Sequence, residues 1–297
     1  MKEILFKGCA TALVTPFTDD GINFKELENL IEFQIAQGID ALVVCGTTGE
    51  SATMTLQEKK DVIKFTTKVV NSRVPVIAGT GSNSTNSCIN LSKYVQDNTN
   101  VNGLLIVTPY YNKATQYGLI KHYSEIACNV NLPIIVYNVP GRTGLNILPE
   151  TCLELSKIEN IVAIKEASGN ISQVANISNL CRDSLPIYSG NDDQILPVLS
   201  LGGIGVISVL SNIMPKEVTH LIHDFMSGNI SKAINSQLNM IDLVTELFSE
   251  VNPIPIKYAL NLLGYNMGTP RLPLTEMSEI GKKNLEKVMQ KYRLLSY

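Results

Sequence analysis

A lysine ends a short apolar segment of the chain. Lys165 follows Ile161-Val-Ala-Ile164, a run typical of a buried β-strand. Burial disfavours the charged ammonium form, and a neutral amine is the nucleophile that forms a Schiff base with a carbonyl compound. The alternative is a strand-end lysine that extends into solvent or pairs with Glu166. Position alone does not separate these two interpretations.

Other side chains that could take part in catalysis or binding also follow apolar runs. Tyr137 carries a phenol that can donate and accept a proton, although a core tyrosine has the same pattern. Thr47 and Thr48, in Gly46-Thr-Thr-Gly-Glu-Ser51, could relay a proton or bind a carboxylate, or form a plain turn. Arg142 could hold a carboxylate through two parallel hydrogen bonds, or lie in a surface loop. Together these groups favour covalent chemistry through the Lys165 amine, of the Schiff-base type.

The elements that must position these groups recur along the chain. Short apolar runs alternate with helical patterns, and continuous apolar runs are typical of parallel strands buried on both faces. The expected strands are Ala10–Val14, Ala41–Cys45, Val74–Ala78, Gly103–Thr108, Ile134–Asn138, Ile161–Lys165, Ile187–Ser189 and Gly205–Val209.

Helix signals lie between these strands. Phe24–Ala36 carries an apolar stripe at helical spacing. Thr55-Leu-Gln-Glu58 reads as a capping box, and Asn170 as the cap of a later helix. Pro215 falls where a first helical turn tolerates proline.

Eight strand–helix units within residues 1–228 predict a (β/α)8 barrel, the TIM-barrel fold. The rival is an open doubly wound sheet with a dinucleotide site, whose glycine fingerprint should follow the first strand. Thr15-Pro16-Phe17 stands there instead. In a barrel of this kind the active site lies at the C-terminal ends of the strands, so the polar groups above should converge on one face.

Residues 229–297 follow a different pattern. Ile230, Ile234, Ile241, Val244 and Phe248 make a helical stripe, and prolines 253 and 255 then interrupt the chain. Further helices are expected near Lys257–Leu263 and Glu276–Tyr292. We expect a helical region packed on the barrel rather than a free domain.

Composition excludes several function classes. The 297 residues carry a formal net charge of −3 without basic blocks, so nucleic acid and anionic membranes are not expected partners. No run is long enough to span a membrane, and the first residues lack a secretory pattern. The six cysteines form no Cys-x-x-Cys pair, which argues against a disulfide framework or a zinc site and favours a cytoplasmic location.

The motifs resemble those of the dihydrodipicolinate synthase family, within the pyruvate-dependent superfamily that includes N-acetylneuraminate lyase. The matches run in order from the first expected strand to the helical region. They are Ala12-Leu-Val-Thr-Pro-Phe17, Gly46-Thr-Thr-Gly-Glu-Ser51, Thr108-Pro-Tyr-Tyr111, Tyr137-Asn-Val-Pro-Gly-Arg-Thr143, Ile164-Lys-Glu-Ala-Ser168, Ser189-Gly-Asn-Asp192, Gly205-Val-Ile-Ser208 and Asn252-Pro-Ile-Pro255.

This resemblance implies four catalytic residues. Lys165 would form the imine with pyruvate, and Tyr137 would shuttle protons as the imine forms and breaks. Thr47 and Tyr111 would complete the proton relay, with Tyr111 reaching in from a neighbouring subunit. The resemblance therefore also implies a homo-oligomer, a tetramer built as a dimer of dimers.

It implies four binding positions as well. Thr48 and the backbone at Ile207 would hold the pyruvate carboxylate, and Gly190 would adjoin the substrate. Arg142 would receive the carboxylate of L-aspartate 4-semialdehyde. The product would be 4-hydroxy-tetrahydrodipicolinate, on the route to lysine and diaminopimelate. Because the imine nitrogen accepts the electrons of the pyruvate methyl group, no metal and no organic cofactor is expected.

Two alternatives stay open. A sugar-acid aldolase of the same superfamily, such as N-acetylneuraminate lyase or 2-keto-3-deoxygluconate aldolase, would share Lys165 and Tyr137 but bind a long polyol. Arg142 favours the synthase, because the semialdehyde carboxylate needs a positive partner. A barrel that has lost catalysis is the second alternative, and the intact set of polar residues argues against it.

One cleft departs from the family pattern. In lysine-inhibited members a cleft between subunits binds lysine, and Ser51, Asn83 and Tyr110 match that cleft. Leu56, Lys59 and Ser87 stand where its histidine-rich and acidic contacts would be. An incoming ammonium group would lack a carboxylate partner and meet a second cation. The sequence therefore predicts weak or absent feedback inhibition by lysine.

Overall fold

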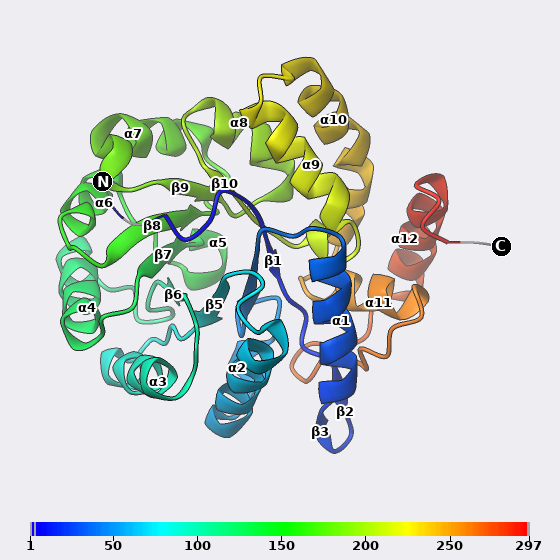
Figure 1. Ribbon diagram of the computed structural model, residues 1–297, viewed down its shortest axis with the longest axis horizontal. Coiled ribbons are helices and arrows are strands. Elements are labelled where there is room, and N and C mark those ends of the chain that lie inside the picture. The colour runs from blue at the N-terminus through cyan, green and yellow to red at the C-terminus, as the bar shows by residue number, and fades with distance from the viewer. Residues whose placement is uncertain (1, 3, 296–297) are drawn as a thin grey trace.

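The computed structural model describes residues 2 and 4–295, and its centre is a closed barrel of eight parallel strands (Figure 1). The order around the barrel is β1-β10-β9-β8-β7-β6-β5-β4, so neighbours in the barrel are also consecutive barrel strands in the chain. This confirms the predicted (β/α)8 fold. The strands are β1 Gly8–Ala12, β4 Ala41–Val44, β5 Val76–Gly79, β6 Gly103–Val107, β7 Ile134–Asn138, β8 Ile161–Glu166, β9 Ile187–Ser189 and β10 Gly205–Ser208, and a small hairpin joins β2 Phe17–Thr18 to β3 Gly21–Ile22.

Two expected strands are shifted in the structure. β1 ends at Ala12, because the N–H of Val14 is bound by the side-chain Oδ1 of Asn212 at 3.2 Å rather than by a strand. β5 begins at Val76, after Pro75, which has no N–H to donate to the ladder. Both shifts move the boundary without changing the element.

Helices surround the barrel on the outside (Figure 1). The capping box predicted at Thr55 and Glu58 is present, Asn170 accepts from the N–H of Gln173, and Pro215 begins its helix. The helices are α1 Phe24–Ala36, α2 Leu56–Val70, α3 Thr85–Asn98, α4 Gln116–Asn129, α5 Pro140–Thr143, α6 Pro149–Ser156, α7 Ile171–Cys181, α8 Ile195–Ser200 and α9 Pro215–Met226, with 3₁₀ turns η1 Ser51–Thr53, η2 Arg182–Ser184, η3 Asp192–Gln194 and η4 Leu210–Asn212.

Two apolar clusters fill the molecule. One lies between the strands and the helices, and a smaller one holds the alternate strand side chains, as the two-residue period of a strand requires. Members of the smaller cluster include Ala10, Val43, Ile77, Leu105, Ile135, Tyr137, Ala163 and Ile207. Tyr188 stacks on Phe6 with ring centroids 4.3 Å apart and donates to the Phe6 carbonyl at 2.7 Å.

The last part of the chain forms α10 Ile230–Leu247, α11 Ile254–Leu262 and α12 Glu279–Lys291, at one side of the barrel (Figure 1). The expectation that Pro255 interrupts the chain is wrong, because it lies in the first turn of α11, where its missing N–H costs nothing. The division at residues 228 and 229 stays an interpretation of the sequence.

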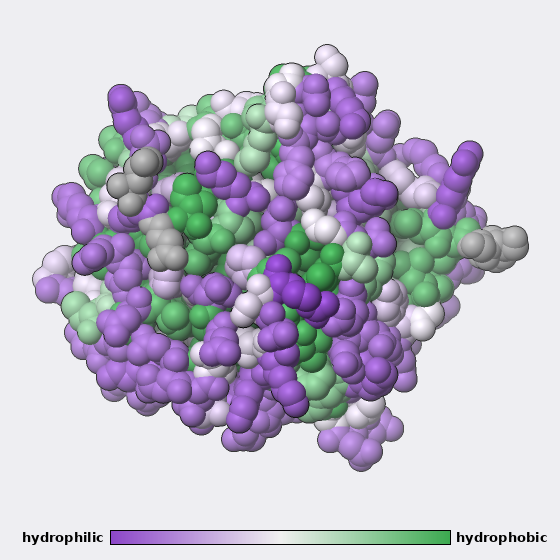
Figure 2. All heavy atoms as spheres, viewed as in Figure 1, coloured by the Kyte–Doolittle hydropathy of each residue, from purple (hydrophilic) through white to green (hydrophobic). Residues whose placement is uncertain are grey.

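The visible face is mainly hydrophilic, with smaller patches of hydrophobic residues between the polar ones (Figure 2). No helix in the described part of the chain is long and apolar enough to cross a bilayer.

Candidate active site

Lys165 and Tyr137 lie opposite each other on neighbouring strands. The register of β7 and β8 pairs these two residues, and the Lys165 Nζ lies 4.2 Å from the centroid of the Tyr137 ring. Both side chains are 6% exposed, so Lys165 does not extend into solvent. The strand register therefore brings an amine and a phenol together in a nearly closed space.

Glu166 does not pair with Lys165. Its carboxylate accepts hydrogen bonds from Asn138 Nδ2 at 2.9 Å, Gln173 Nε2 at 3.1 Å and the N–H of Ser168 at 2.7 Å. These three donors supply hydrogen-bond partners to both oxygens of the Glu166 carboxylate. The alternative of a Lys165–Glu166 ion pair is wrong.

Gly190 lies against the stem of Lys165. Its N–H donates to the Glu166 carbonyl at 2.8 Å, just past the end of β9. A Cβ at this position would lie 3.1 Å from Lys165 Cε and 2.5 Å from Ala167 Cβ. The absence of a side chain at residue 190 is what leaves room for the amine.

Thr47 and Thr48 lie in a tightly held loop after β4. Glu50 adopts a left-handed backbone with φ of 54°, and its N–H donates to the Thr47 carbonyl at 3.0 Å. The Thr15 hydroxyl donates to the Gly49 carbonyl at 2.8 Å. Thr48 is buried. This loop is fixed by its own backbone and by Thr15 of the segment after β1, which suits a preformed binding site.

Arg142 borders a cavity of about 300 Å³ beside this loop. It lies on α5, directly after β7, and its Nη2 donates to the backbone carbonyl of Asn252 at 3.3 Å. Thr47 and Asn252 line the same cavity. Arg142 and Thr47 thus line one space at the C-terminal ends of the strands.

Ile207 and Tyr111 have opposite environments. Ile207 is fully buried on β10, opposite Ala10 of β1. Tyr111 is 86% exposed and has a positive φ of 79°. Within a single chain the structure therefore places every predicted site residue at the C-terminal face, but it leaves the Tyr111 phenol in solvent.

Comparison with known proteins agrees with this geometry. The model of the dihydrodipicolinate synthetase family matches residues 5–292. The chain belongs to this family. It is 55% identical to 4-hydroxy-tetrahydrodipicolinate synthase 1 of Clostridium acetobutylicum, over 98% of this chain and 99% of that protein.

Solved structures of dihydrodipicolinate synthases have the same fold. The enzyme from Thermotoga maritima superposes with a TM-score of 0.96 and 42% identity, covering 98% of this chain and all of that one. A structure described as the first monomeric dihydrodipicolinate synthase variant gives a TM-score of 0.96 and 42% identity, with 98% of each chain covered. The resemblance drawn from the motifs is confirmed, and the synthase interpretation is favoured over the sugar-acid aldolase.

Sequence reasoning gave no role to two buried residues of this family member. Asp192 Oδ2 accepts from the N–H groups of Val209 and Leu210, each at 2.9 Å. Burial raises the pKa of Asp192, while its hydrogen bonds and the charge of Lys165 act in the opposite direction. Asn252 joins Thr48 to Arg142. Both residues stood in the family motifs, but only the fold shows what they contact.

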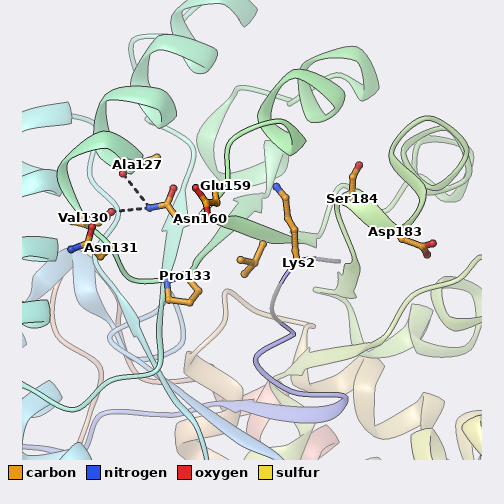
Figure 3. Close-up of a pocket in the computed structure, with 10 residues that line it drawn as sticks. Lys2, Ala127, Val130, Asn131, Pro133, Glu159, Asn160, Asp183 and Ser184 are labelled. Atoms are coloured by element: carbon orange, nitrogen blue, oxygen red, sulfur yellow. Dashed lines mark hydrogen bonds between the residues drawn. The ribbon is translucent and has the colours of Figure 1, made fainter.

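A larger cavity, of about 880 Å³, lies at the other end of the barrel (Figure 3). It is lined by residues that precede β7, β8 and β9, including Pro133, Asn160 and Ser184. Lys2 donates there to the carbonyls of Ile158 and Ile161. The catalytic groups of a (β/α)8 enzyme lie at the opposite end, so this cavity is not the candidate active site.

Proposed function

We propose that this family member condenses pyruvate with L-aspartate 4-semialdehyde to 4-hydroxy-tetrahydrodipicolinate through a Schiff base on Lys165. The observation that carries the proposal is the buried Lys165 amine, 4.2 Å from the centre of the Tyr137 ring at the C-terminal end of the barrel. A nucleophile and a proton carrier are the two groups that imine formation needs.

The chemistry follows from these two groups. The Lys165 nitrogen attacks the keto carbon of pyruvate, and the keto oxygen leaves as water after it takes one proton from the attacking amine and one from Tyr137. The protonated imine nitrogen then accepts electrons as the Tyr137 phenolate takes a methyl proton, which gives an enamine. The enamine carbon attacks the aldehyde carbon, and the aldehyde oxygen takes a proton from Tyr137 to become the hydroxyl group. The amino group of the semialdehyde finally displaces Lys165 as the ring closes, and its released proton returns to Tyr137. Thr47 and Tyr111 carry protons to and from Tyr137.

The two carboxylates of the substrates have separate partners. Thr48 and the backbone at Ile207 hold the pyruvate carboxylate, with Gly190 leaving the space beside Lys165. Arg142 binds the carboxylate of the semialdehyde at the cavity of about 300 Å³. A cavity of this size with a cation at its border suits a short acidic aldehyde better than a long polyol.

Borohydride reduction tests this proposal. The wild-type protein with pyruvate should gain a stable adduct on the peptide that contains Lys165, and Lys165→Ala should gain none. Addition of L-aspartate 4-semialdehyde should then give turnover. An adduct with turnover only on N-acetylmannosamine or glyceraldehyde would move the assignment to the aldolases, and an unmodified peptide would remove the Schiff base altogether.

We further propose a homotetramer in which Tyr111 completes the active site of a neighbouring subunit. Tyr110 and Val251 are exposed apolar side chains that line the cavity, and Tyr111, next to Tyr110 in the chain, is exposed as well. A second apolar group, Ile230, Ile234 and Leu238, is exposed on α10. Two such groups suit a dimer of dimers, so sedimentation as a tetramer is the expected result.

Lysine should inhibit the enzyme weakly. Lys59 lines the cavity together with Ser51 and Tyr110, and its own ammonium group would repel that of lysine. Leu56 and Ser87 are exposed and supply no carboxylate. An inhibition curve should stay nearly flat through low millimolar lysine, and a strong loss of activity in that range would contradict this proposal.

The enzyme should work in the cytoplasm. Its six cysteines are all free, and five of them are buried. Free buried thiols suit a reducing compartment, where small keto acids and amino-acid precursors are also made. Fractionation of the source cells with an antibody against the protein would test this location.

A further inference from the structure

Asn252 connects the two groups that hold the substrate carboxylates. Its side-chain Nδ2 donates to Thr48 Oγ1 at 3.0 Å, and its backbone carbonyl accepts from Arg142 Nη2 at 3.3 Å. The residue is 5% exposed. Thr48 follows β4 and Arg142 follows β7, and these two strands are not neighbours in the barrel. One asparagine from the C-terminal region therefore spans the distance between them.

The direction of the hydrogen bond to Thr48 decides where its proton goes. A threonine hydroxyl has one proton and two lone pairs, whereas an amide nitrogen only donates. When Thr48 Oγ1 accepts from Asn252, its own proton is left for another acceptor. A carboxylate beside Thr48 is such an acceptor, and a hydrogen bond to a charged group is among the stronger ones.

Asn252 is itself held firmly in place. It precedes α11, and one turn into that helix Lys257 Nζ contacts Glu50 Oε1 at 2.8 Å. Glu50 is two residues after Thr48, and its other carboxylate oxygen accepts from the N–H of Arg271 at 2.9 Å. The C-terminal region thus contacts the loop of Thr48 through Glu50 as well as through Asn252. These added contacts hold Asn252 in position beside Thr48.

Resting on the proposed function, we infer that Asn252 is a positioning residue that turns the Thr48 hydroxyl proton toward the pyruvate carboxylate and fixes Arg142 relative to it. It touches neither reacting carbon. It orients the Thr48 hydroxyl and sets the distance between Thr48 and Arg142, which bind the two substrate carboxylates. That distance limits the length of the aldehyde substrate that fits.

Asn252→Asp tests this inference, because it keeps the shape and replaces the amide donor by an acceptor. The Thr48 proton would then point to Asp, away from pyruvate. We expect the KM for pyruvate to rise about 10- to 100-fold, with a smaller change in kcat at saturating pyruvate. Asn239→Asp adds the same charge at an exposed position of α10 and should leave both constants unchanged.

A merely structural role would not give this pattern. In a Thr48→Val background, Asn252→Asp should add almost nothing to the KM for pyruvate, since the hydroxyl is already gone. Asn252→Ala, which removes the donor without adding charge, should raise the KM in the same direction and serves where the Asp variant fails to fold. If Asn252→Asp raises the KM for pyruvate by the same factor with and without Thr48→Val, the two effects are independent, and this result would overturn the inference.

The opposite orientation of the amide predicts a different result. Asn252 Oδ1 has no hydrogen-bond partner among the described residues, and if it faced Thr48, Asp would preserve the contact. An unchanged KM for pyruvate in a folded Asn252→Asp variant would therefore also overturn the inference. Borohydride trapping with pyruvate alone measures the same binding step without the aldehyde, so a failure of the proposed acceptor is separable from a failure of this inference.

Discussion

At the scale of single residues, the reactive amine depends on a residue that has no side chain. Gly190 leaves the space that the stem of Lys165 occupies, and a Cβ there would come within 3.1 Å of Lys165 Cε. The backbone of Gly190 is also tied to Glu166 by a hydrogen bond of 2.8 Å, so it cannot simply move aside. The position of the amine thus depends on the missing side chain just after β9 as much as on its own strand.

Gly190→Ala should lower kcat/KM for pyruvate about 100-fold, because the added methyl group displaces Lys165 and a misplacement of about 1 Å has an effect of that size. The measurement is steady-state kinetics together with the yield of the borohydride adduct. Gly141→Ala is the matched control, since its Cβ would meet nothing within 4 Å. Equal activities of the two variants would contradict the steric argument.

At the scale of elements, α11 and the loop after β4 are joined by a buried ion pair. Lys257 Nζ lies 2.8 Å from Glu50 Oε1, and the two side chains are 1% and 0% exposed. Burial lowers the pKa of Lys257, and the adjacent Glu50 carboxylate opposes that change. Lys257 also lies 4.3 Å from the centroid of the Phe17 ring, so β2 joins the same contact.

Lys257→Met should lower the free energy of unfolding by about 3–5 kcal/mol, because Glu50 would keep a buried charge without its partner. The double variant with Glu50→Gln should recover part of that loss. Denaturant midpoints would measure both. Lys25→Met removes an exposed pair with Glu28 and should change stability by less than about 0.5 kcal/mol. A Lys257 variant as stable as this control would contradict the prediction.

At the scale of the whole molecule, stability should fall in mild acid. His122 is buried on α4, with Nδ1 2.9 Å from Thr85 Oγ1 on α3, and Nε2 has no partner among the described residues. Burial lowers the pKa of His122 from 6.5 to about 4. Between about pH 6.5 and 4, His122 therefore binds a proton in the unfolded chain but stays neutral in the folded one. The free energy of unfolding falls as the pH drops through this range.

The expected loss from His122 is roughly 3 kcal/mol over that range. Stability curves against pH for wild type and His122→Asn would measure it, and the variant should have the shallower slope. His220→Asn, at an exposed position of α9, should keep the slope of the wild type. Parallel curves for wild type and His122→Asn would show that the acid sensitivity has another source.

The sequence by itself determined the barrel and most of the helix starts, because buried parallel strands and N-caps are local patterns. α1 has the predicted bounds, and the capping box at Thr55 is present. The role of Pro255 was not predictable in this way: it lies in the first turn of α11 instead of interrupting the chain, since the effect of a proline depends on which helical turn it occupies. The motifs also determined the family, since they run in order along the whole chain.

Only the tertiary structure decided how distant segments meet. The contacts of Thr48 with Asn252 and of Glu50 with Lys257 join residues more than 200 positions apart, and no local pattern encodes such a pairing. The choice between an ion-paired and a free Lys165 was likewise settled by Asn138 and Gln173, which satisfy Glu166 from other strands and helices. The sequence determines which chemical groups are present. Which groups contact each other depends on the closure of the barrel and on the packing of the C-terminal helices against it.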